Sequence, residues 1–575
     1  MLLAAALVVP AGAQHTSSNQ NIPGFRDAAR EHALERQFLR VPDTKLAEQH
    51  LLVLTAAPHL AGTPEDRATA EYVAQKFREA GLKTEIRPYR VWLDRPLTVK
   101  LELTAPEGAE FSGPTRESAV GDTFVDDPRV TPGFNSYSAS GEVEAEVVYA
   151  NYGTEEDFRA LRQHGTNVRG KIVLARYGQI FRGVKVRLAE ENGARGVLLF
   201  SDPSDDGYAR GDAYPNGPWR PATAVQRGSV EFGIEPGDPT TPGFASTAAN
   251  DARRIAAADS RDLPHIPVIP LSAADAQPIL ESLGGHAAPR DWQGGLPLTY
   301  RAGPGPARVH MEVRQQGALT TIWNVIGRIE GSETPEQLVI AGNHRDAWVY
   351  GAVDPSSGTA AMLEAVHGIG ELLQTGWRPK RTIVFASWDA EEQGLIGSTE
   401  WVEDNEPQLA TAVAYFNLDS GASGPLFRAC ASGELKNFVR DVARAVPSPD
   451  GGTLYDRWRG SAEDEGPRQF GAPVTNLGGG SDYAAFVHHA GVPSTDIRSL
   501  GDYGVYHSAF DNFAWYTRFG DPGFRYTQEL ARFLGLEVLR MAEADVLPYD
   551  FSQYGREVAG YVERSAMRAL RRRSA

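Results

Sequence analysis

An apolar run at residues 382–386 leads into two adjacent carboxylates, Glu391 and Glu392. The run is typical of a buried strand of a parallel sheet, and open α/β sheets bind ligands at the edge where such strands end. Neighbouring side chains diverge at a strand end, so one carboxylate can bind a metal while the other faces a substrate. Alone, such a pair is more typical of a solvated helix start. Its surroundings make an α/β fold with a site at this edge the better interpretation.

Other apolar runs also end in polar residues. The expected strand 337–341 leads to His344, and the expected strand 412–418 leads to an aspartate. A DPSSG segment at 354–358 precedes a helical pattern at 359–375, and a histidine follows Tyr506. Each of these is an ordinary loop residue by itself. Together they give four carboxylates and two imidazoles at strand ends or in the loops beyond: His344, Asp354, Glu391, Glu392, Asp419 and His507.

This combination of residue types suits a pair of metal ions. Zinc takes imidazole nitrogen and carboxylate oxygen and keeps an open position in catalytic sites. Two ions about 3.5–4 Å apart need a bridging ligand, which a carboxylate provides through its two oxygens. Five ligands with one bridge would give each metal three protein ligands. The remaining carboxylate is then available as a general base.

The motifs resemble a known family. They lie at 342–348, 354–358, 388–401, 417–419 and 506–508. They are similar to those of the dinuclear-zinc peptidase family that contains glutamate carboxypeptidase II and transferrin receptor, and the likeness extends from about residue 43 to about residue 561. The resemblance implies an α/β fold with a zinc aminopeptidase-like mixed sheet flanked by helices. It also implies an inserted, β-rich protease-associated (apical) domain.

The resemblance assigns roles to the six residues and to one more. Asp354 would bridge two Zn²⁺ ions. His507 and Glu392 would complete one site, and His344 and Asp419 the other. Glu391 would be the general base, and Asp346 a carboxylate that orients the site. Every ligand position is filled, which favours an enzyme over a receptor of the transferrin-receptor kind.

Substrate residues also follow from the resemblance. Arg182 would clamp a substrate carboxylate, for which the guanidinium fork is well shaped. The other pocket positions match at Tyr506, Leu395, Gly480 and Arg428, and Ser481 stands at one further pocket position. Three positions depart from the family pattern, because Ser229 and Ser481 replace asparagines and Asp496 replaces an arginine. These changes put a strict preference for glutamate or acidic dipeptides in doubt.

The resemblance further implies a structural Ca²⁺ between the insert and the catalytic domain. Glu400 and Glu403 lie one turn apart on the expected helix after the Glu pair, and Thr241 with the carbonyl of Phe244 would complete the set. All four ligands are oxygen atoms, which calcium prefers. An exposed acidic helix face is the alternative.

Composition narrows the class of protein. The chain has 575 residues, which predicts two or three domains, and its net charge of −17 argues against nucleic acid and anionic membranes as partners. Residues 1–13 resemble a secretory signal peptide, too short to span a bilayer. Cys430 is the only cysteine, so no internal disulfide can form. A secreted or periplasmic protein without a membrane anchor is expected.

The expected domains are a catalytic part at 14–96, the protease-associated insert at 97–319, the second catalytic part at 320–544, and a short remnant of a helical dimerisation domain at 545–575. This short remnant weakens the case for a homodimer. The sequence therefore predicts a zinc-dependent exopeptidase, carboxypeptidase-like, acting on small peptides. An aminopeptidase with the same metals stays open, with Asp496 as an acidic pocket group. A binding protein and a single-zinc cyclising transferase are less favoured.

Overall fold

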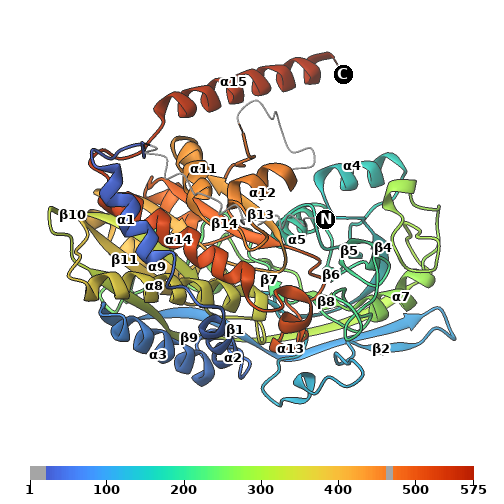
Figure 1. The fold of residues 1–575 in the computed structure, drawn as a ribbon. Helices are drawn as coiled ribbons and strands as arrows, with labels where there is room; N and C mark the ends of the chain where they lie inside the picture. The colour runs from blue at the N-terminus through green and yellow to red at the C-terminus, as the bar shows by residue number, and fades with distance from the viewer. Residues whose placement is uncertain (1–20, 462–470, 575) are drawn as a thin grey trace, which may run out of the picture.

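The computed structural model describes residues 21–461 and 471–574 (Figure 1). The expected signal peptide at 1–13 lies outside these residues. A twelve-stranded sheet runs through the molecule in the order β13-β14-β12-β10-β11-β9-β4-β5-β6-β8, with β1 paired to β9 and β2 to β1. In the described part of the chain no helix combines the length and the apolar character needed to cross a membrane.

The catalytic half of the sheet has a parallel centre. Its strands are β10 (Thr334–His344), β11 (Arg381–Trp388), β12 (Ala412–Asn417) and β14 (Ser494–Leu500). β10 pairs in parallel with β11 and β12, and β12 pairs in parallel with β14. β9 (Arg308–Ile329) and β13 (Leu426–Ala431) add antiparallel edges. Because the four parallel strands point the same way, their carboxyl ends lie along one rim of the sheet.

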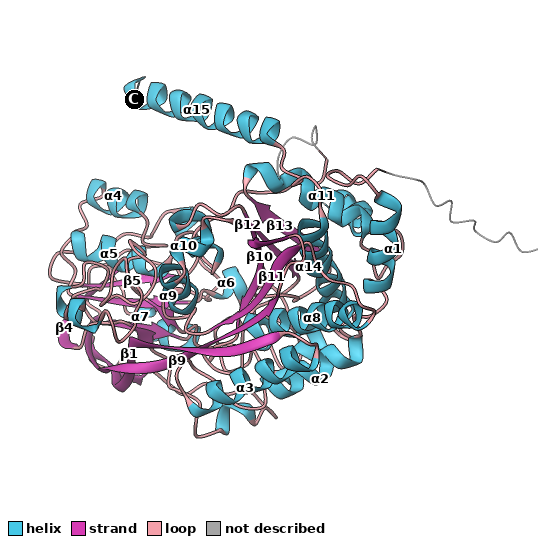
Figure 2. Cartoon of the chain, turned by 90° about the vertical axis from the view of Figure 1, so that its left-hand side faces the viewer, coloured by secondary structure: helices cyan, strands magenta, loops and turns pink. Residues whose placement is uncertain are grey.

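Helices cover both faces of this half (Figure 2). On one face a large apolar core joins the strands to α3 (Pro64–Glu79), α8 (Gly358–Gln374), α11 (Lys436–Ala445) and α14 (Arg525–Glu543). The other face packs against α9 (Ile396–Asp404) and the segment 483–492. The remaining helices here are α1 (Ala28–Phe38), α2 (Thr44–Leu54), α10 (Glu406–Leu409), α12 (Leu454–Ser461) and α13 (Phe513–Trp515). The predicted helix 359–375 is confirmed, and Gly376 follows it with φ +91°.

The insert has its own core. Four strands pair in parallel, namely β4 (Gly141–Tyr149), β5 (Ile172–Arg176), β6 (Gly196–Phe200) and β8 (Val268–Leu271). They enclose a second apolar cluster with α4 (Glu155–Gln163), α5 (Arg182–Glu191) and α7 (Ala273–Glu281). Shorter elements are β2 (Phe111–Gly113), β3 (Asn135–Ser136), β7 (Gly228–Ser229) and α6 (Pro203–Asp206). The parallel pairing makes this part α/β, with more helix than the expected β-rich domain.

A long two-stranded ribbon joins the two halves. β1 (Lys83–Ala105) pairs with β9 along almost its whole length, and Figure 2 shows both strands passing from one half to the other. The C-terminal end of β9 pairs with β11, and its N-terminal end pairs with β4. The expected domain boundaries at 96/97 and 319/320 therefore fall inside continuous strands. Pairing with β9 keeps the chain extended past residue 97 as far as Ala105.

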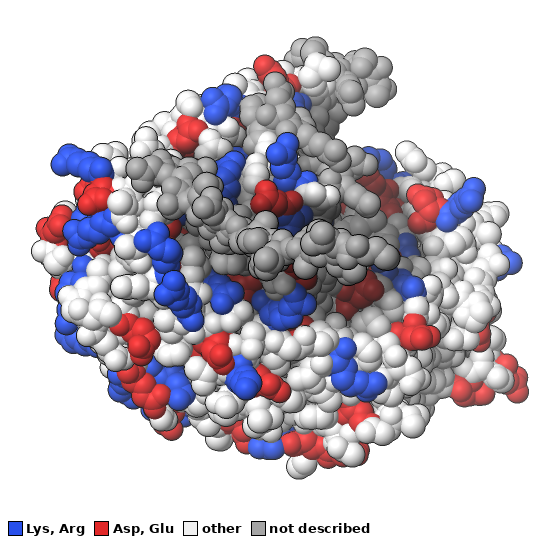
Figure 3. Space-filling view, in the orientation of Figure 1, with Lys and Arg blue, Asp and Glu red and all other residues white. Residues whose placement is uncertain are grey.

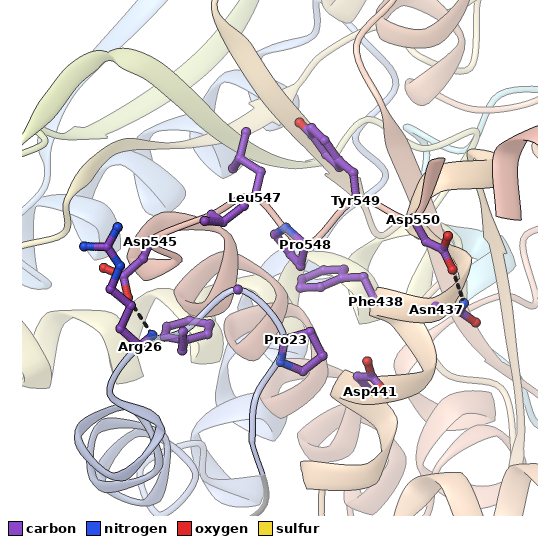
Figure 4. Close-up of a pocket in the computed structure, with 13 residues that line it drawn as sticks. Pro23, Arg26, Asn437, Phe438, Asp441, Asp545, Leu547, Pro548, Tyr549 and Asp550 are labelled. Carbon is purple, nitrogen blue, oxygen red and sulfur yellow. Dashed lines mark hydrogen bonds between the residues drawn. The ribbon is translucent and has the colours of Figure 1, made fainter. Parts of the chain in front are cut away.

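The C-terminal region is a single helix, α15 (Phe551–Ser574), that leaves the body of the molecule (Figure 1). The segment before it packs against the N-terminal segment. Arg26 N donates to Asp545 Oδ2 at 2.8 Å, and Val546 N donates to Gly24 O at 3.0 Å. A cavity of about 560 Å³ lies at this junction, lined also by α11 (Figure 4). It shares no lining residue with the cavity onto which four of the six candidates, Asp354, Glu391, Glu392 and Asp419, open.

One close approach in the catalytic core gives a test of the fold. Phe38 packs directly against Gly535 in α14, so a Cβ added to this glycine would lie 1.9 Å from the phenyl ring. A Cβ added to Gly555 in α15 would have no atom within 4 Å. Helix propensity alone predicts that alanine stabilises both sites. We expect Gly535→Ala instead to lower the free energy of unfolding by about 1–3 kcal/mol through overpacking.

Gly555→Ala is the matched control and should leave the unfolding midpoint in denaturant unchanged or slightly raised. Equal effects of the two substitutions would contradict this packing.

Candidate active site

His344 is the last residue of β10, and hydrogen bonding fixes its tautomer. Its Nδ1 lies 3.2 Å from the backbone oxygen of Asp346, which can only accept, so Nδ1 carries the proton. Nε2 therefore presents a lone pair in the neutral ring. It lies 3.0 Å from Asp419 Oδ1, 3.5 Å from Asp354 Oδ1 and 3.9 Å from Glu391 Oε2. A buried imidazole held this way has the arrangement of a metal ligand.

His507 has the same arrangement on the other side. It lies in the loop after β14, and its Nδ1 donates to the backbone oxygen of Arg227 at 3.1 Å. Its Nε2 lies 3.3 Å from Asp354 Oδ2 and 3.2 Å from Glu392 Oε2, yet makes no hydrogen bond within the described residues. The lone pair of His507 thus points between two carboxylates.

Asp354 lies between the imidazoles, with one oxygen toward each. It occupies an irregular turn, φ −110° and ψ 100°, between β10 and α8. Asp511 holds this turn, because its carboxylate accepts the backbone N–H of Val353 at 2.9 Å and of Asp354 at 3.2 Å, and Tyr503 donates to it at 2.8 Å. The last sequence motif ends at residue 508, before Asp511, and does not indicate this role. Only the fold brings it against a turn more than 150 positions earlier.

The adjacent carboxylates Glu391 and Glu392 are positioned through their backbone. Asp346 accepts the N–H of Glu391 at 3.0 Å through one oxygen and the N–H of Glu392 at 3.2 Å through the other. Ala390 and Leu395, on either side of the pair, adopt the left-handed region with φ of 56° and 59°. Such strain in residues other than glycine is typical of functional sites. Asp346 thus orients both carboxylates.

A buried ion network supports the same loop from below. Arg345 Nη2 lies 2.8 Å from Asp389 Oδ2 and 3.0 Å from Asp66 Oδ1, and all three side chains are fully buried. Asp389 also accepts the backbone N–H of Trp323 at 2.6 Å. This network ties the end of β11 to α3 and to the residue after His344. The sequence analysis did not find it, because Asp66 lies in a distant helix.

The six candidates converge in two groups: His344, Glu391 and Asp419, and Asp354, Glu392 and His507. Within each group, ligand atoms lie within 4.8 Å of one another. The third member of the first group is Glu391. In the family pattern, the third ligand at this position is instead Asp354, which bridges the two metals. Asp354 is the carboxylate that reaches both imidazoles, and Glu391 is the more distant from His344.

The electrostatics of the site call for cations. Burial and the carboxylates of Asp419, Asp482 and Glu392 raise the pKa of Glu391 well above its usual range, and His344 opposes them. Burial also raises the pKa of Glu392, whose Oε1 has no hydrogen-bond partner among the described residues. Three buried carboxylates and the half-buried Asp419, gathered around two imidazoles, are costly without positive charge. The donor set therefore fits two divalent ions.

A cavity of about 820 Å³ opens onto these residues from the insert side. Of the predicted substrate residues, it is lined by Arg182, Tyr506, Leu395 and Gly480, together with Ser229. Arg182 Nε donates to the backbone oxygen of Ser229 at 2.9 Å, and the ring of Tyr506 stacks on His507 with centroids 3.6 Å apart.

Two predicted pocket residues lie elsewhere. Ser481 donates to Asp419 Oδ2 at 2.5 Å and so holds a candidate ligand instead of lining the main cavity. Arg428 is also absent from the wall of this cavity. Its antiparallel register partner in β14, Arg498, lines the cavity in its place. Register partners of an antiparallel pair lie on the same face of the sheet, so these two arginines are neighbours, and a motif alone does not show which of the two strands borders the cavity.

The expected calcium residues do come together. Glu400 Oε1 accepts the N–H of Asp238 at 2.9 Å, Ser246 N also donates to Glu400, and Thr241 exchanges a hydrogen bond with the Ser246 hydroxyl at 2.6 Å. Burial raises the pKa of Glu400 to about 8, and burial with the charge of Glu400 raises that of Glu403 to about 9. Glu403 Oε2 is buried and, within the described residues, unpartnered. Phe244 lies in the same loop, since its N–H donates to Thr241 O at 3.2 Å.

Comparison with known proteins identifies the family. Residues 324–518 match the model of peptidase family M28, and residues 143–231 match the PA domain. The chain is 42% identical over 515 residues to "Probable glutamate carboxypeptidase LAMP1" of Arabidopsis thaliana, covering 88% of this chain and 73% of the relative. It is 37% identical to "Aminopeptidase NAALADL1" of Mus musculus, covering 92% and 74%.

The chain belongs to peptidase family M28. The fold agrees with solved M28 structures. A peptidase M28 precursor from Shewanella amazonensis aligns with a TM-score of 0.57 and 18% identity over 90% of this chain and 98% of that one. A zinc aminopeptidase from Bacillus subtilis aligns with a TM-score of 0.54 and 18% identity over 88% and 98%. The predictions of a metallopeptidase and of an α/β fold with a protease-associated insert are confirmed.

The double acceptor role of Asp346 gives a test of this M28 site. We expect Asp346→Asn to weaken zinc binding roughly 10–100-fold, because an amide nitrogen cannot accept the second backbone N–H. Competition with a chromophoric chelator measures the affinity.

The control is Asp545→Asn, which alters a carboxylate that also accepts a backbone N–H but lies far from the site. Equal zinc affinity in wild type and Asp346→Asn would contradict the orienting role.

Proposed function

We propose that this M28 peptidase is a dinuclear-zinc exopeptidase that hydrolyses small peptides in the manner of a glutamate carboxypeptidase. The observation that carries the proposal is the position of Asp354, whose two oxygens each face a different imidazole. A carboxylate so placed can bridge two ions. The name of the 42% identical plant relative supports the carboxypeptidase assignment.

The ligand assignment follows the two groups. Asp354 would bridge, His507 and Glu392 would hold one zinc, and His344 and Asp419 would hold the other. Ser481 and Asp346 orient Asp419 and Glu392 by hydrogen bonds. When bound there, the zinc pair would polarise a peptide carbonyl and lower the pKa of water.

Glu391 is proposed as the general base. It lines the cavity, and its Oε2 lies 3.9 Å from His344 Nε2, beside the candidate metal ligands and within reach of a water held there. Its carboxylate would accept the proton of the attacking water and later deliver it to the nitrogen of the leaving amine. Asp346 accepts the backbone N–H of Glu391 and so fixes the backbone from which this carboxylate reaches into the site.

Arg182 would bind the free carboxylate of the substrate. Its guanidinium enters the cavity from the first turn of α5 and has its Nε engaged by Ser229. Its terminal nitrogens suit bidentate binding. Tyr506, Leu395 and Gly480 would form the surrounding walls, and Ser481 and Arg428 remain weaker candidates for substrate contact.

Aminopeptidase activity is the second candidate, and the name of the 37% identical mouse relative favours it. Asp496, the acidic group expected to serve it, is already engaged, since Asn417 donates to its Oδ1 at 2.9 Å. A receptor-like binding protein without catalysis would need neither zinc nor Glu391.

Three finer features complete the proposal. Glu400, Glu403, Thr241 and the Phe244 carbonyl would hold a structural Ca²⁺, for which the unpartnered Glu403 oxygen is the supporting observation. Export to a secreted or periplasmic location is proposed from the sequence of residues 1–13. A homodimer is the third feature, proposed from the resemblance of residues 545–575 to the start of the family's helical dimerisation domain.

Replacement of the general base separates binding from chemistry. We expect Glu391→Gln to keep two zinc ions per chain and to lose at least about 10²-fold in kcat on dipeptides and capped tripeptides. Metal content by emission spectroscopy and initial rates measure the two quantities. Wild-type turnover in Glu391→Gln would refute the role of this carboxylate.

Removal of the proposed carboxylate clamp tests the substrate end. Arg182→Ala should raise KM roughly 10-fold or more for peptides with a free C-terminal carboxylate, and have little effect on C-terminally amidated peptides. The exposed Arg314→Ala in β9 controls for loss of one positive charge. If KM for the free peptides stays at the wild-type value, Arg182 does not bind the carboxylate.

A further inference from the structure

The wall of the active-site cavity contains a carboxylate that neither the metal centre nor the proposed clamp uses. Glu231 follows β7 in the insert, is 8% exposed and lines the cavity beside Arg182 and Ser229. Its Oε2 makes no hydrogen bond in the part of the chain that the structure describes. We propose that Glu231 determines specificity by binding a positively charged group of the peptide substrate. This inference rests on the proposed peptidase function.

Glu231 lies close to the position of the reaction. A methyl group added to Gly394 would lie 3.6 Å from its carboxylate carbon. Gly394 belongs to the turn that presents the general base, since its N–H donates to Glu391 O at 2.9 Å. The ends of such a turn lie within about 7 Å of each other. The carboxylate therefore lies against the turn that carries Glu391 and lines the same cavity, where a peptide held at the candidate metal site can reach it.

The insert is fastened to this turn, so the position of Glu231 is well defined. Gly237 N donates to the backbone oxygen of Gly394 at 2.8 Å. Gly183 lets α5 approach so closely that a Cβ there would lie 1.6 Å from Glu231 O. Two backbone contacts on either side thus fix the residue against the catalytic loop and against the helix that carries Arg182.

Two other buried acids of the insert have partners within the protein. Asp238 accepts from Thr240, Ser246 and Arg254, and Glu117 pairs with Arg227 at 2.8 Å. In the described residues no ion pair joins Glu231 to Arg182, whose Nε is held by Ser229. Glu231 differs from these two acids because its Oε2 has no hydrogen-bond partner among the described residues while the residue lines the cavity.

A cation from the substrate would supply the missing partner. Burial and the nearby Asp262 raise the pKa of Glu231 to about 7, with Arg182 opposing them, which reflects the cost of an uncompensated charge. An ammonium or guanidinium group offers the charged donors that a carboxylate accepts most strongly. With Arg182 on the same wall, the cavity offers one site for a negative group and one for a positive group.

Two substrate groups share this chemistry, namely a basic side chain next to the scissile bond and a free α-amine. Acetylated tripeptides carrying lysine or the neutral isostere norleucine on either side of the bond test the first. The same norleucine peptides with free and with acetylated N-termini test the second. The readout is the ratio of kcat/KM for the charged peptide to that for its neutral partner.

We expect the wild type to prefer one class of charged peptide roughly 10–100-fold, as for a charged hydrogen bond in a buried site. Glu231→Gln should bring that ratio to within about twofold of one, and Glu231→Lys should invert it. Glu235→Gln removes the same charge from an exposed position on the same wall and measures the general effect of charge. Its ratio should stay near that of the wild type.

The inference is overturned if the kcat/KM ratio stays at the wild-type value in both Glu231→Gln and Glu231→Lys. It is also overturned if the wild type shows no preference for the charged member of any peptide pair. The same holds if the kcat/KM ratio falls as much in the control Glu235→Gln as in Glu231→Gln. Thermal unfolding of each variant shows whether it is folded, and Glu231→Asp should retain part of the preference. If the wild type cleaves no neutral or charged peptide, the proposed function itself fails, which is a separate outcome.

Discussion

Four carboxylates and two imidazoles are held together in a buried space at the carboxyl ends of β10, β11, β12 and β14. The parallel register forces this meeting, because each strand delivers its following loop to the same rim. Negative charge gathered in this way is unfavourable in a protein interior unless cations or protons balance it. The rest of the molecule can be understood as the structure needed to hold that arrangement.

Most of the supporting interactions are hydrogen bonds from backbone N–H groups to carboxylates that lie behind the candidate ligands. Asp346 holds the Glu391–Glu392 pair, and Asp511 holds the turn of Asp354. Arg345 lies beneath them, paired with two aspartates. Three residues in this region other than glycine, Ala390, Leu395 and His507, adopt positive φ. Conformations of this kind persist only where the surroundings fix them.

Much of the site was predictable from sequence, because strand ends in a parallel sheet have a fixed spatial relation. His344, Asp419 and the Glu pair follow apolar runs, so the periodicity of the chain places them at one rim. Helices such as α8 were also predictable from apolar spacing and a terminal glycine. The general class of the insert followed from motifs, although its strands pair in parallel and its boundaries fall within β1 and β9.

Other features depend on contacts that sequence patterns do not encode. The role of Ser481 depends on its hydrogen bond to Asp419. The choice between Arg428 and Arg498 depends on which of the two paired strands borders the cavity. Glu231 is an ordinary acidic residue in sequence. It becomes notable only when the fold buries it against Gly394 and, within the described residues, leaves its Oε2 without a hydrogen bond. Such residues are set by tertiary burial, which local propensity does not determine.

The central claim is that one carboxylate, Asp354, lies between two cations, each also bound by one imidazole. Anomalous diffraction at the zinc edge from zinc-soaked crystals tests it most directly. Two peaks are predicted on either side of the Asp354 carboxylate, one in contact with Nε2 of His344 and the other with Nε2 of His507. A single peak, or peaks that avoid either nitrogen, would contradict the account.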